Sequence, residues 1–90
     1  MPKHDWAYDD DIVAYYLCRF DFDDLLVDLN GISRKLGMKT GSMKMRISNF
    51  KALEGRGRLV NAAALSREVY TRFKNITKSE HLGEVQRILY

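Results

Sequence analysis

Proline, cysteine and long apolar runs are scarce in this chain, and each scarcity excludes a class of structure. The 90 residues include one proline, at position 2, so no predicted helix has an internal proline break. Cys18 is the single cysteine and has no partner for an internal disulfide, which fits a reducing cytoplasm. No apolar run approaches the ~18 residues of a membrane helix, and the N-terminus lacks the apolar core of a signal peptide. We therefore expect a cytoplasmic protein with no membrane partner.

Patterns typical of catalytic and metal sites are also missing. The two histidines, His4 and His81, lack the cysteine and histidine spacing of a zinc site. The aspartates after residue 20 do not form an EF-hand, because Leu26 and Ile32 occupy the positions that need glycine and glutamate. Cys18 lies within a predicted helix, where a lone cysteine is more typical of a small core residue than of a nucleophile. We expect no enzyme activity, no catalytic residue, no metal site and no cofactor.

Charge is unevenly distributed along the sequence. Residues 1–30 carry eight acidic side chains, all aspartates, and two bases, whereas residues 31–90 carry thirteen lysines and arginines and four glutamates. The formal net charge of +3 therefore hides an acidic third and a basic remainder. This distribution favours a polyanionic partner for the basic part, with the acidic third turned away from it.

Apolar residues recur at helical spacing throughout the chain, and strand-like alternation is weak. With no internal repeat or low-complexity tract, residues 1–90 are predicted to form a single all-α domain of four to five helices. The aspartates at positions 9–11 suit a helix start, and Thr77 with Glu80 forms a capping box. Thr40 or Ser42 and then Asn61 are the other predicted caps. The predicted helices cover residues 9–20, 23–29 with a continuation over 30–36, 40–53, 62–73 and 77–90; Gly31 either separates 23–29 from 30–36 or lies inside one helix.

Residues 29–54 carry the pattern of a helix-turn-helix. A short apolar helix ends at Leu36, Gly37 suits the left-handed residue after a helix, and a second amphipathic helix follows within a few residues. Ile32 and Leu36 are expected to brace the second helix through apolar contacts with Met43 and Ile47. Such a pair presents its second helix to the major groove of duplex DNA, which is wide enough for one helix.

A helical wheel at about 100° per residue divides residues 40–53 into two faces. The stripe predicted to be buried consists of Met43, Ile47, Phe50 and Leu53. The opposite face consists of Gly41, Lys44, Met45, Ser48 and Ala52, flanked by Ser42, Asn49 and Lys51. Small side chains on that face would allow close approach to base edges.

The chemistry of the side chains suggests which part of DNA each would contact. Asn49 suits adenine, and Met45 suits the methyl group of thymine. Arg46 borders the buried stripe and is expected to reach a phosphate, as are the other bases around the helix. The predicted DNA-binding residues are Arg34, Lys35, Lys39, Thr40, Ser42, Lys44, Met45, Arg46, Ser48, Asn49, Lys51, Arg56 and Arg58.

These residues also carry a family resemblance, which spans most of residues 6–73. The chain resembles the helix-turn-helix region at the N-terminus of some bacterial HNH-type restriction endonucleases, through Trp6, Leu36-Gly37, Ser42-Met43-Lys44-Met45-Arg46-Ile47-Ser48-Asn49-Phe50, Gly57-Arg58-Leu59, Val69-Tyr70 and Phe73. The resemblance implies DNA reading without DNA cleavage, because the HNH nuclease module is missing. It would suit a small stand-alone regulator of phage or mobile-element origin.

The residues thus predict sequence-specific binding of double-stranded DNA by a small transcriptional regulator, with two questions left open. The acidic third either caps helices and adds solubility, or imitates DNA phosphates and binds a basic protein. A phage-type inhibitor of a nuclease or CRISPR complex would act in the second way. The C-terminal helix carries an apolar stripe that either completes the core or forms a homodimer: Leu82, Val85, Ile88 and Leu89.

Overall fold

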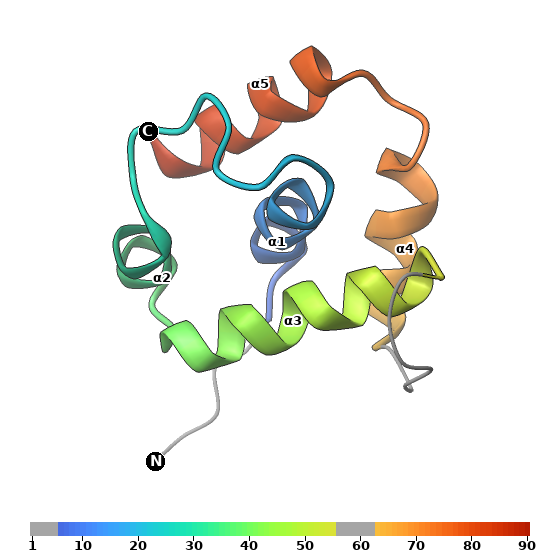
Figure 1. The fold of residues 1–90 in the computed structure, drawn as a ribbon, viewed down its shortest axis with the longest axis horizontal. Helices are drawn as coiled ribbons and strands as arrows, with labels where there is room; N and C mark the ends of the chain where they lie inside the picture. The colour runs from blue at the N-terminus through green and yellow to red at the C-terminus, as the bar shows by residue number, and fades with distance from the viewer. Residues whose placement is uncertain (1–5, 56–62) are drawn as a thin grey trace.

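The computed structural model describes residues 6–55 and 63–90, and within these ranges the chain is helical with no strand. Its elements are α1 (Tyr8–Phe20), α2 (Leu29–Leu36), α3 (Thr40–Leu53), α4 (Ala64–Phe73) and α5 (Lys78–Leu89) (Figure 1). The prediction of a small all-α domain with four to five helices is therefore confirmed.

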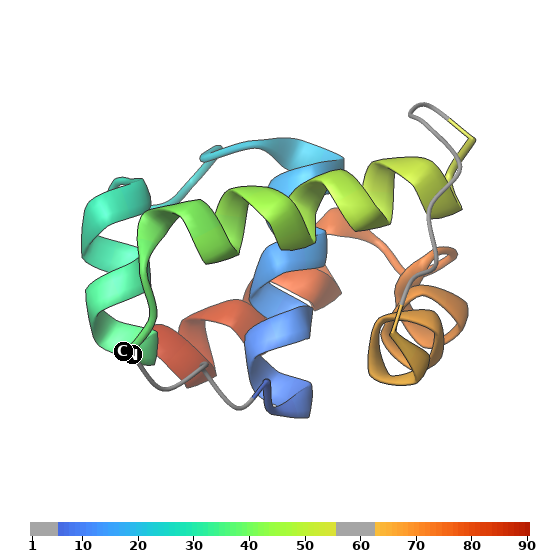
Figure 2. The same cartoon turned by 90° about the horizontal axis from the view of Figure 1, so that it is seen from below.

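Helix α1 lies at the centre, with the other four helices arranged around it (Figure 1). Nine consecutive residues, from Asp10 to Cys18, are buried, so the helix is enclosed on all sides rather than along one stripe. Helix α3 crosses α1 on one side, and α4 and α5 pack against its other sides (Figure 2). The apolar residues of α1 form the core, and the polar residues enclosed with them require partners.

The buried carboxylate of Asp11 is paired with Arg46 of α3. Arg46 donates two hydrogen bonds to Asp11, from Nε at 2.6 Å and from Nη2 at 2.8 Å. Ser66 of α4 donates a third hydrogen bond, 3.3 Å long, to the same carboxylate. One buried charge on α1 therefore joins three helices.

Arg19 and His81 form a second polar contact at the other end of α1. Arg19 donates to the backbone oxygens of Phe73 and Ile76, at 2.6 and 2.8 Å, and so binds the carbonyls that follow α4. Its Nη1 also lies 3.1 Å from Nδ1 of His81. Because a guanidinium can only donate, Nδ1 accepts, and Nε2 of His81 carries the proton that it donates to the Ile12 oxygen at 2.9 Å. This geometry requires a neutral imidazole.

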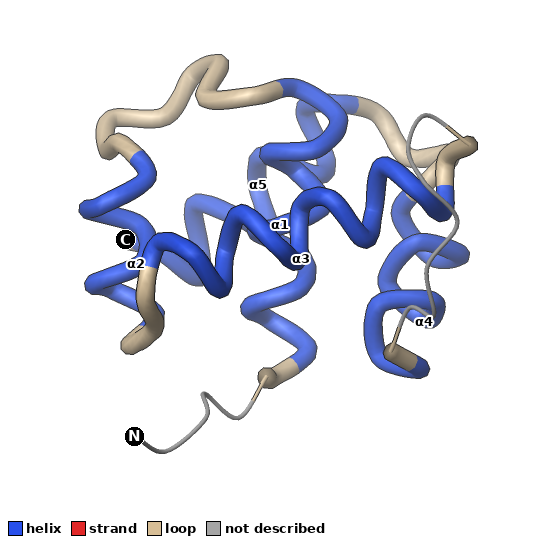
Figure 3. The backbone as a smooth tube through the Cα atoms, turned by 60° about the horizontal axis from the view of Figure 1, so that its bottom comes forward, coloured by secondary structure: helices blue, strands red, loops and turns tan. Residues whose placement is uncertain are grey.

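The helix predicted over residues 23–29 is wrong, because the chain forms turns between α1 and α2 (Figure 3). Asp21 and Asp24 have left-handed φ angles of 58° and 63°, which are incompatible with a continuing helix. Asp28 is extended and accepts a hydrogen bond from the Gly31 backbone, so it caps α2. Aspartate favours such local contacts over helix interiors, and Gly31 lies inside the helix that follows.

Other helix ends match the predictions to different degrees. The capping box at Thr77 is confirmed, since its hydroxyl accepts from the Glu80 backbone at 3.1 Å. Helix α3 begins at Thr40, but its cap position is Lys39, which makes no side-chain cap hydrogen bond. Helix α4 begins at residue 64 rather than 62. The predicted cap Asn61 lies outside the described residues.

The apolar stripe of α5 packs inside the domain. Val85 is 0% exposed and Leu89 4% exposed, and Leu82 and Ile88 are partly buried against the same core. These side chains therefore complete the core, the first of the two roles open from the sequence. Leu82 and Ile88 keep part of their surface exposed, and the homodimer through this helix stays a prediction.

We predict that Phe50→Ala lowers the free energy of unfolding by about 3–5 kcal/mol, the usual cost of truncating a buried phenylalanine. Phe50 is fully buried, and its ring stacks on that of Tyr15 with centroids 4.8 Å apart. Urea unfolding measures the change. Met45→Ala on the exposed side of α3 is the control, expected within about 0.5 kcal/mol of wild type. Equal midpoints for Phe50→Ala and wild type would contradict the packing.

We also predict that stability falls as the pH is lowered from about 6.5 to about 4. Burial lowers the pKa of His81 to about 4, and the Arg19 charge acts in the same direction. Within this window the unfolded chain binds a proton at this histidine and the folded chain does not. The free energy of unfolding therefore falls by about 3 kcal/mol across the window. Urea unfolding at several pH values tests this against His81→Gln, which should lose much of the pH dependence. An unchanged pH dependence in that variant would refute the assignment.

Candidate nucleic-acid interface

Helices α2 and α3 are joined by a tight turn at Gly37. Gly37 adopts the left-handed conformation, with φ 74° and ψ 31°. The backbone of Met38 then donates to the Ser33 oxygen at 2.9 Å, which closes the C-terminus of α2. Ile32 of α2 and Met43 of α3 are fully buried in one core cluster. The local geometry is that of two braced helices connected by three residues.

Helix α3 has one buried and one exposed side, as the wheel predicted. Met43 and Phe50 are fully buried, and Ile47 and Leu53 are partly buried against the core. Met45 is 72% exposed although it is apolar. The exposed residues recur at helical spacing and are Gly41, Lys44, Met45, Ser48 and Lys51. The predicted outer residues Thr40, Ser42, Asn49 and Ala52 are partly exposed.

No acidic residue occurs between Asp28 and Glu54, the stretch that forms α2, the turn and α3. Its exposed bases are Arg34, Lys35, Lys39, Lys44 and Lys51. A helix pair with this composition presents positive charge without neutralising carboxylates of its own. It is therefore the part of the described chain best suited to a polyanion.

Arg46 does not belong to this exposed set, although the sequence pattern placed it at a phosphate. Its side chain is 11% exposed and bound to Asp11, and its guanidinium lies 4.4 Å from the centre of the Trp6 ring. A buried bidentate pair holds the cation inside the domain, so we leave Arg46 out of the interface. The predicted contacts Arg56 and Arg58 lie outside the described residues.

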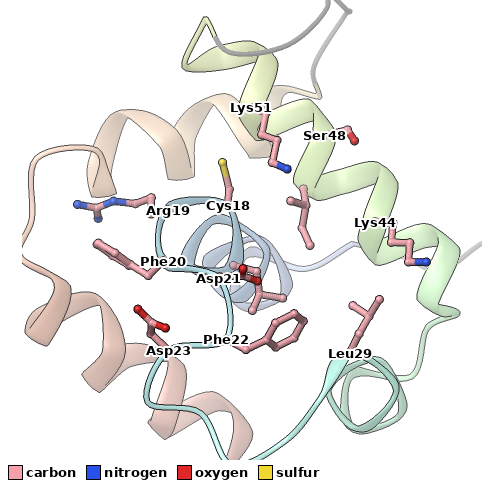
Figure 4. A pocket seen from close by; sticks show the side chains of 12 residues that line it. Cys18, Arg19, Phe20, Asp21, Phe22, Asp23, Leu29, Lys44, Ser48 and Lys51 are labelled. Atoms are coloured by element: carbon pink, nitrogen blue, oxygen red, sulfur yellow. The ribbon is translucent and has the colours of Figure 1, made fainter.

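A groove of about 700 Å³ runs along one flank of α3. Figure 4 shows α3 on one side of it and the end of α1 with the following turn on the other. From α3 it is lined by Lys44, Ile47, Ser48 and Lys51, and from the turn by Asp21, Phe22 and Asp23. Sequence reasoning missed this groove because its two walls, α3 and the turn after α1, lie about twenty or more residues apart in the chain and meet only through tertiary packing.

Most aspartates of the acidic third have partners within the chain. Asp10 accepts from the Ala7 backbone, Asp11 binds Arg46, and Asp28 caps α2. Asp23 and Asp24 each lie 3.3 Å from the Lys78 ammonium, and Asp9 lies 3.5 Å from the Arg87 guanidinium. These contacts are those of caps and ion pairs, although Asp21, Asp23 and Asp24 are exposed together on the turn after α1.

Glu54, the first acid after the basic stretch, contacts α1. Tyr15 donates to its carboxylate at 3.0 Å, and the Cys18 sulfur lies 3.5 Å from the other oxygen. Burial raises the pKa of Tyr15, and the Glu54 carboxylate raises it further. The tyrosine therefore stays protonated and holds the end of α3 against α1. Cys18 is 5% exposed, and its sulfur lies beside the Glu54 carboxylate.

No protein-family model, curated protein or solved structure matches this chain. The resemblance to the HNH restriction endonucleases thus stays a prediction from the residues. Among the described residues, no helix combines the length and apolar character that crossing a membrane requires. Within the same ranges, no three potential metal ligands lie together.

We predict that Arg46→Met destabilises the fold by about 3–5 kcal/mol, because it leaves the buried Asp11 carboxylate without its cation. The double variant Asp11→Asn plus Arg46→Met should recover part of this loss, which a double-mutant cycle of urea unfolding measures. Lys44→Met is the matched control on the exposed side of α3. If Arg46→Met were as mild as the control, the pair would not support the fold.

Proposed function

We propose that this protein binds double-stranded DNA sequence-specifically through the exposed side of α3 and acts as a small transcriptional regulator. The observation that carries the proposal is the acid-free helix pair, whose second helix exposes small, polar and basic side chains on one side. The major groove of duplex DNA is wide enough for one helix with such a surface. Helix α2 and the turn at Gly37 would hold it in position.

The exposed residues divide between base contacts and phosphate contacts. Gly41 and Ser48 are small enough to let the helix approach base edges, and Ser48 can exchange hydrogen bonds with them. Met45 offers an exposed apolar group to the methyl of thymine. Lysine and arginine side chains around α3 supply phosphate contacts, which position the protein on the duplex without reading its sequence.

The alternative of an inhibitor that imitates DNA through its acidic third has less support. Mimicry needs a continuous array of exposed carboxylates, whereas Asp11 is 0% and Asp10 7% exposed. Asp28 is occupied as a helix cap. Asp10, Asp11 and Asp28 are thus used within the fold, and the exposed Asp21, Asp23 and Asp24 lie together on one turn.

We predict duplex binding with a strong salt dependence. With about five phosphate contacts, the logarithm of the association constant should fall with the logarithm of salt concentration with a slope of about −4 to −5. Fluorescence anisotropy with labelled duplexes, including genomic fragments from the protein's own promoter, measures this slope. Lys51→Ala should lower its magnitude by about 1 and weaken all sequences alike. Lys74→Ala, which removes an exposed charge directly after α4, is the control. Absence of binding to any duplex at low salt would reject the proposal.

We predict that substitutions on the outer side of α3 change sequence preference rather than overall affinity. Ser48→Ala and Asn49→Ala should each relax discrimination at one base pair, and a lost bidentate contact costs about 1–3 kcal/mol. Selection from a randomised duplex library, compared with Lys51→Ala, separates the two kinds of effect. An unchanged preference in both variants would show that a different side of α3 faces the bases.

A further inference from the structure

The groove beside α3 has two rims of opposite charge. Lys44 and Lys51 lie on the α3 rim, one turn either side of Ile47 and Ser48. Asp21 and Asp23 lie on the opposite rim, formed by the turn after α1 (Figure 4). Both lysines and both aspartates are exposed. Lys78 lies 3.3 Å from both Asp23 and Asp24, and with Asp21 the turn still holds three carboxylates against this one ammonium.

The surface between the rims is apolar. Ile47 of α3, Leu17 of α1 and Leu29 of α2 line the groove, together with Phe22, which is 37% exposed. Phe22 is one of four large hydrophobic side chains exposed in the described part of the chain. The groove therefore offers an apolar floor that water solvates poorly, bordered by a row of positive and a row of negative charge.

A surface with this pattern is complementary to itself. A rotation of 180° about an axis that runs along the groove, in the plane of the contact, turns a second copy over onto the first, so the lysine rim of one copy meets the aspartate rim of the other. The same rotation brings the two apolar floors together. Two-fold contacts of this kind use one patch on both subunits and are the commonest way in which identical chains associate.

We propose that a second copy of this chain docks on this groove, with Lys44 and Lys51 facing Asp21 and Asp23 of the second copy in both directions. Charge complementarity favours a second copy as the occupant, because an occupant that carries both charges pairs with both rims at once. Exposed ion pairs are each worth about 0–1 kcal/mol. The association is therefore weak and sensitive to salt, and it differs from a dimer through α5.

The consequence for function rests on the proposed DNA binding. The second copy covers Lys44, Ser48 and Lys51, which are also residues proposed to contact DNA. Self-association and DNA binding then compete, and a rise in protein concentration withdraws protein from DNA. The docking itself does not need DNA, so the two proposals fail separately.

Charge exchange between the rims tests the docking. The variant Lys44→Glu plus Lys51→Glu makes both rims negative. The variant Asp21→Asn plus Asp23→Lys makes both rims positive, and asparagine is chosen at position 21 because it tolerates the φ of 58° there. Each variant should repel itself, while an equimolar mixture of the two should form a heterodimer.

Sedimentation equilibrium without DNA measures the association of wild type, each variant and the mixture. We expect wild type to associate at about 20 mM salt and to lose most of this association at about 500 mM, where screening acts within a few ångströms. Both variants alone should be monomers, and the mixture should regain the wild-type mass. A wild type that stays monomeric at about 1 mM protein and low salt would overturn the proposal. So would a mixture that stays monomeric or a variant that still associates alone.

An NMR dilution series on the wild type keeps the test independent of how the variants fold. Concentration-dependent shifts should centre on the amides of Phe22, Lys44 and Ile47, and shifts confined to α4 or α5 would overturn the docking site. Duplex titration at both protein concentrations then tests competition. Self-association without competition would support the groove contact and show that DNA binds elsewhere on the protein. Competition would show that the second copy and DNA use the same surface.

Discussion

The pairing of buried polar groups on the central helix is the constraint on which the rest of the fold depends. Helix α1 carries the buried Asp11 near one end and the partly buried Arg19 at the other. Removing one partner of a buried ion pair lowers the free energy of unfolding by about 3–5 kcal/mol. The surrounding helices must therefore lie where they supply a partner for each of these groups. Arg46 of α3 is the partner of Asp11. His81 and the backbone oxygens of Phe73 and Ile76 are the partners of Arg19. Apolar contacts then fill the space between these points.

The same pairing decides which side of α3 faces outward. Because Arg46 must reach Asp11, α3 cannot rotate about its axis without breaking two hydrogen bonds to a buried carboxylate. Phe50, stacked on Tyr15, lies on the same inward side. The remaining side therefore presents Lys44, Met45 and Ser48 to the solvent. The orientation of the proposed DNA-binding surface thus follows from the pairing of Arg46 with the buried Asp11.

The distribution of acids and bases follows from the same principle. Several aspartates serve as caps or ion-pair partners, so their charge is used within the domain, whereas most bases of α2 and α3 are exposed. The net charge of +3 thus understates how positive the α3 surface is. Asp21 and Asp23 are nevertheless exposed, although Asp23 also pairs with Lys78, and the turn that carries them lies across a groove from Lys44 and Lys51. That arrangement makes one surface suitable for both DNA and a second copy of the chain.

Local features were open to prediction from the sequence, and long-range pairing was not. Helical periodicity, the glycine turn at Gly37, the capping box at Thr77 and the two sides of α3 depend on residues within a few positions of each other, so the sequence alone determined them. The turns over residues 23–28 were misjudged because local apolar spacing there resembled a helix, while aspartates with left-handed backbones ended it. Only the tertiary structure decided that Arg46 binds Asp11, 35 residues away, that Val85 is enclosed in the core, and that a groove separates two charged rims. These depend on which distant partner a side chain meets, and no local pattern carries that information.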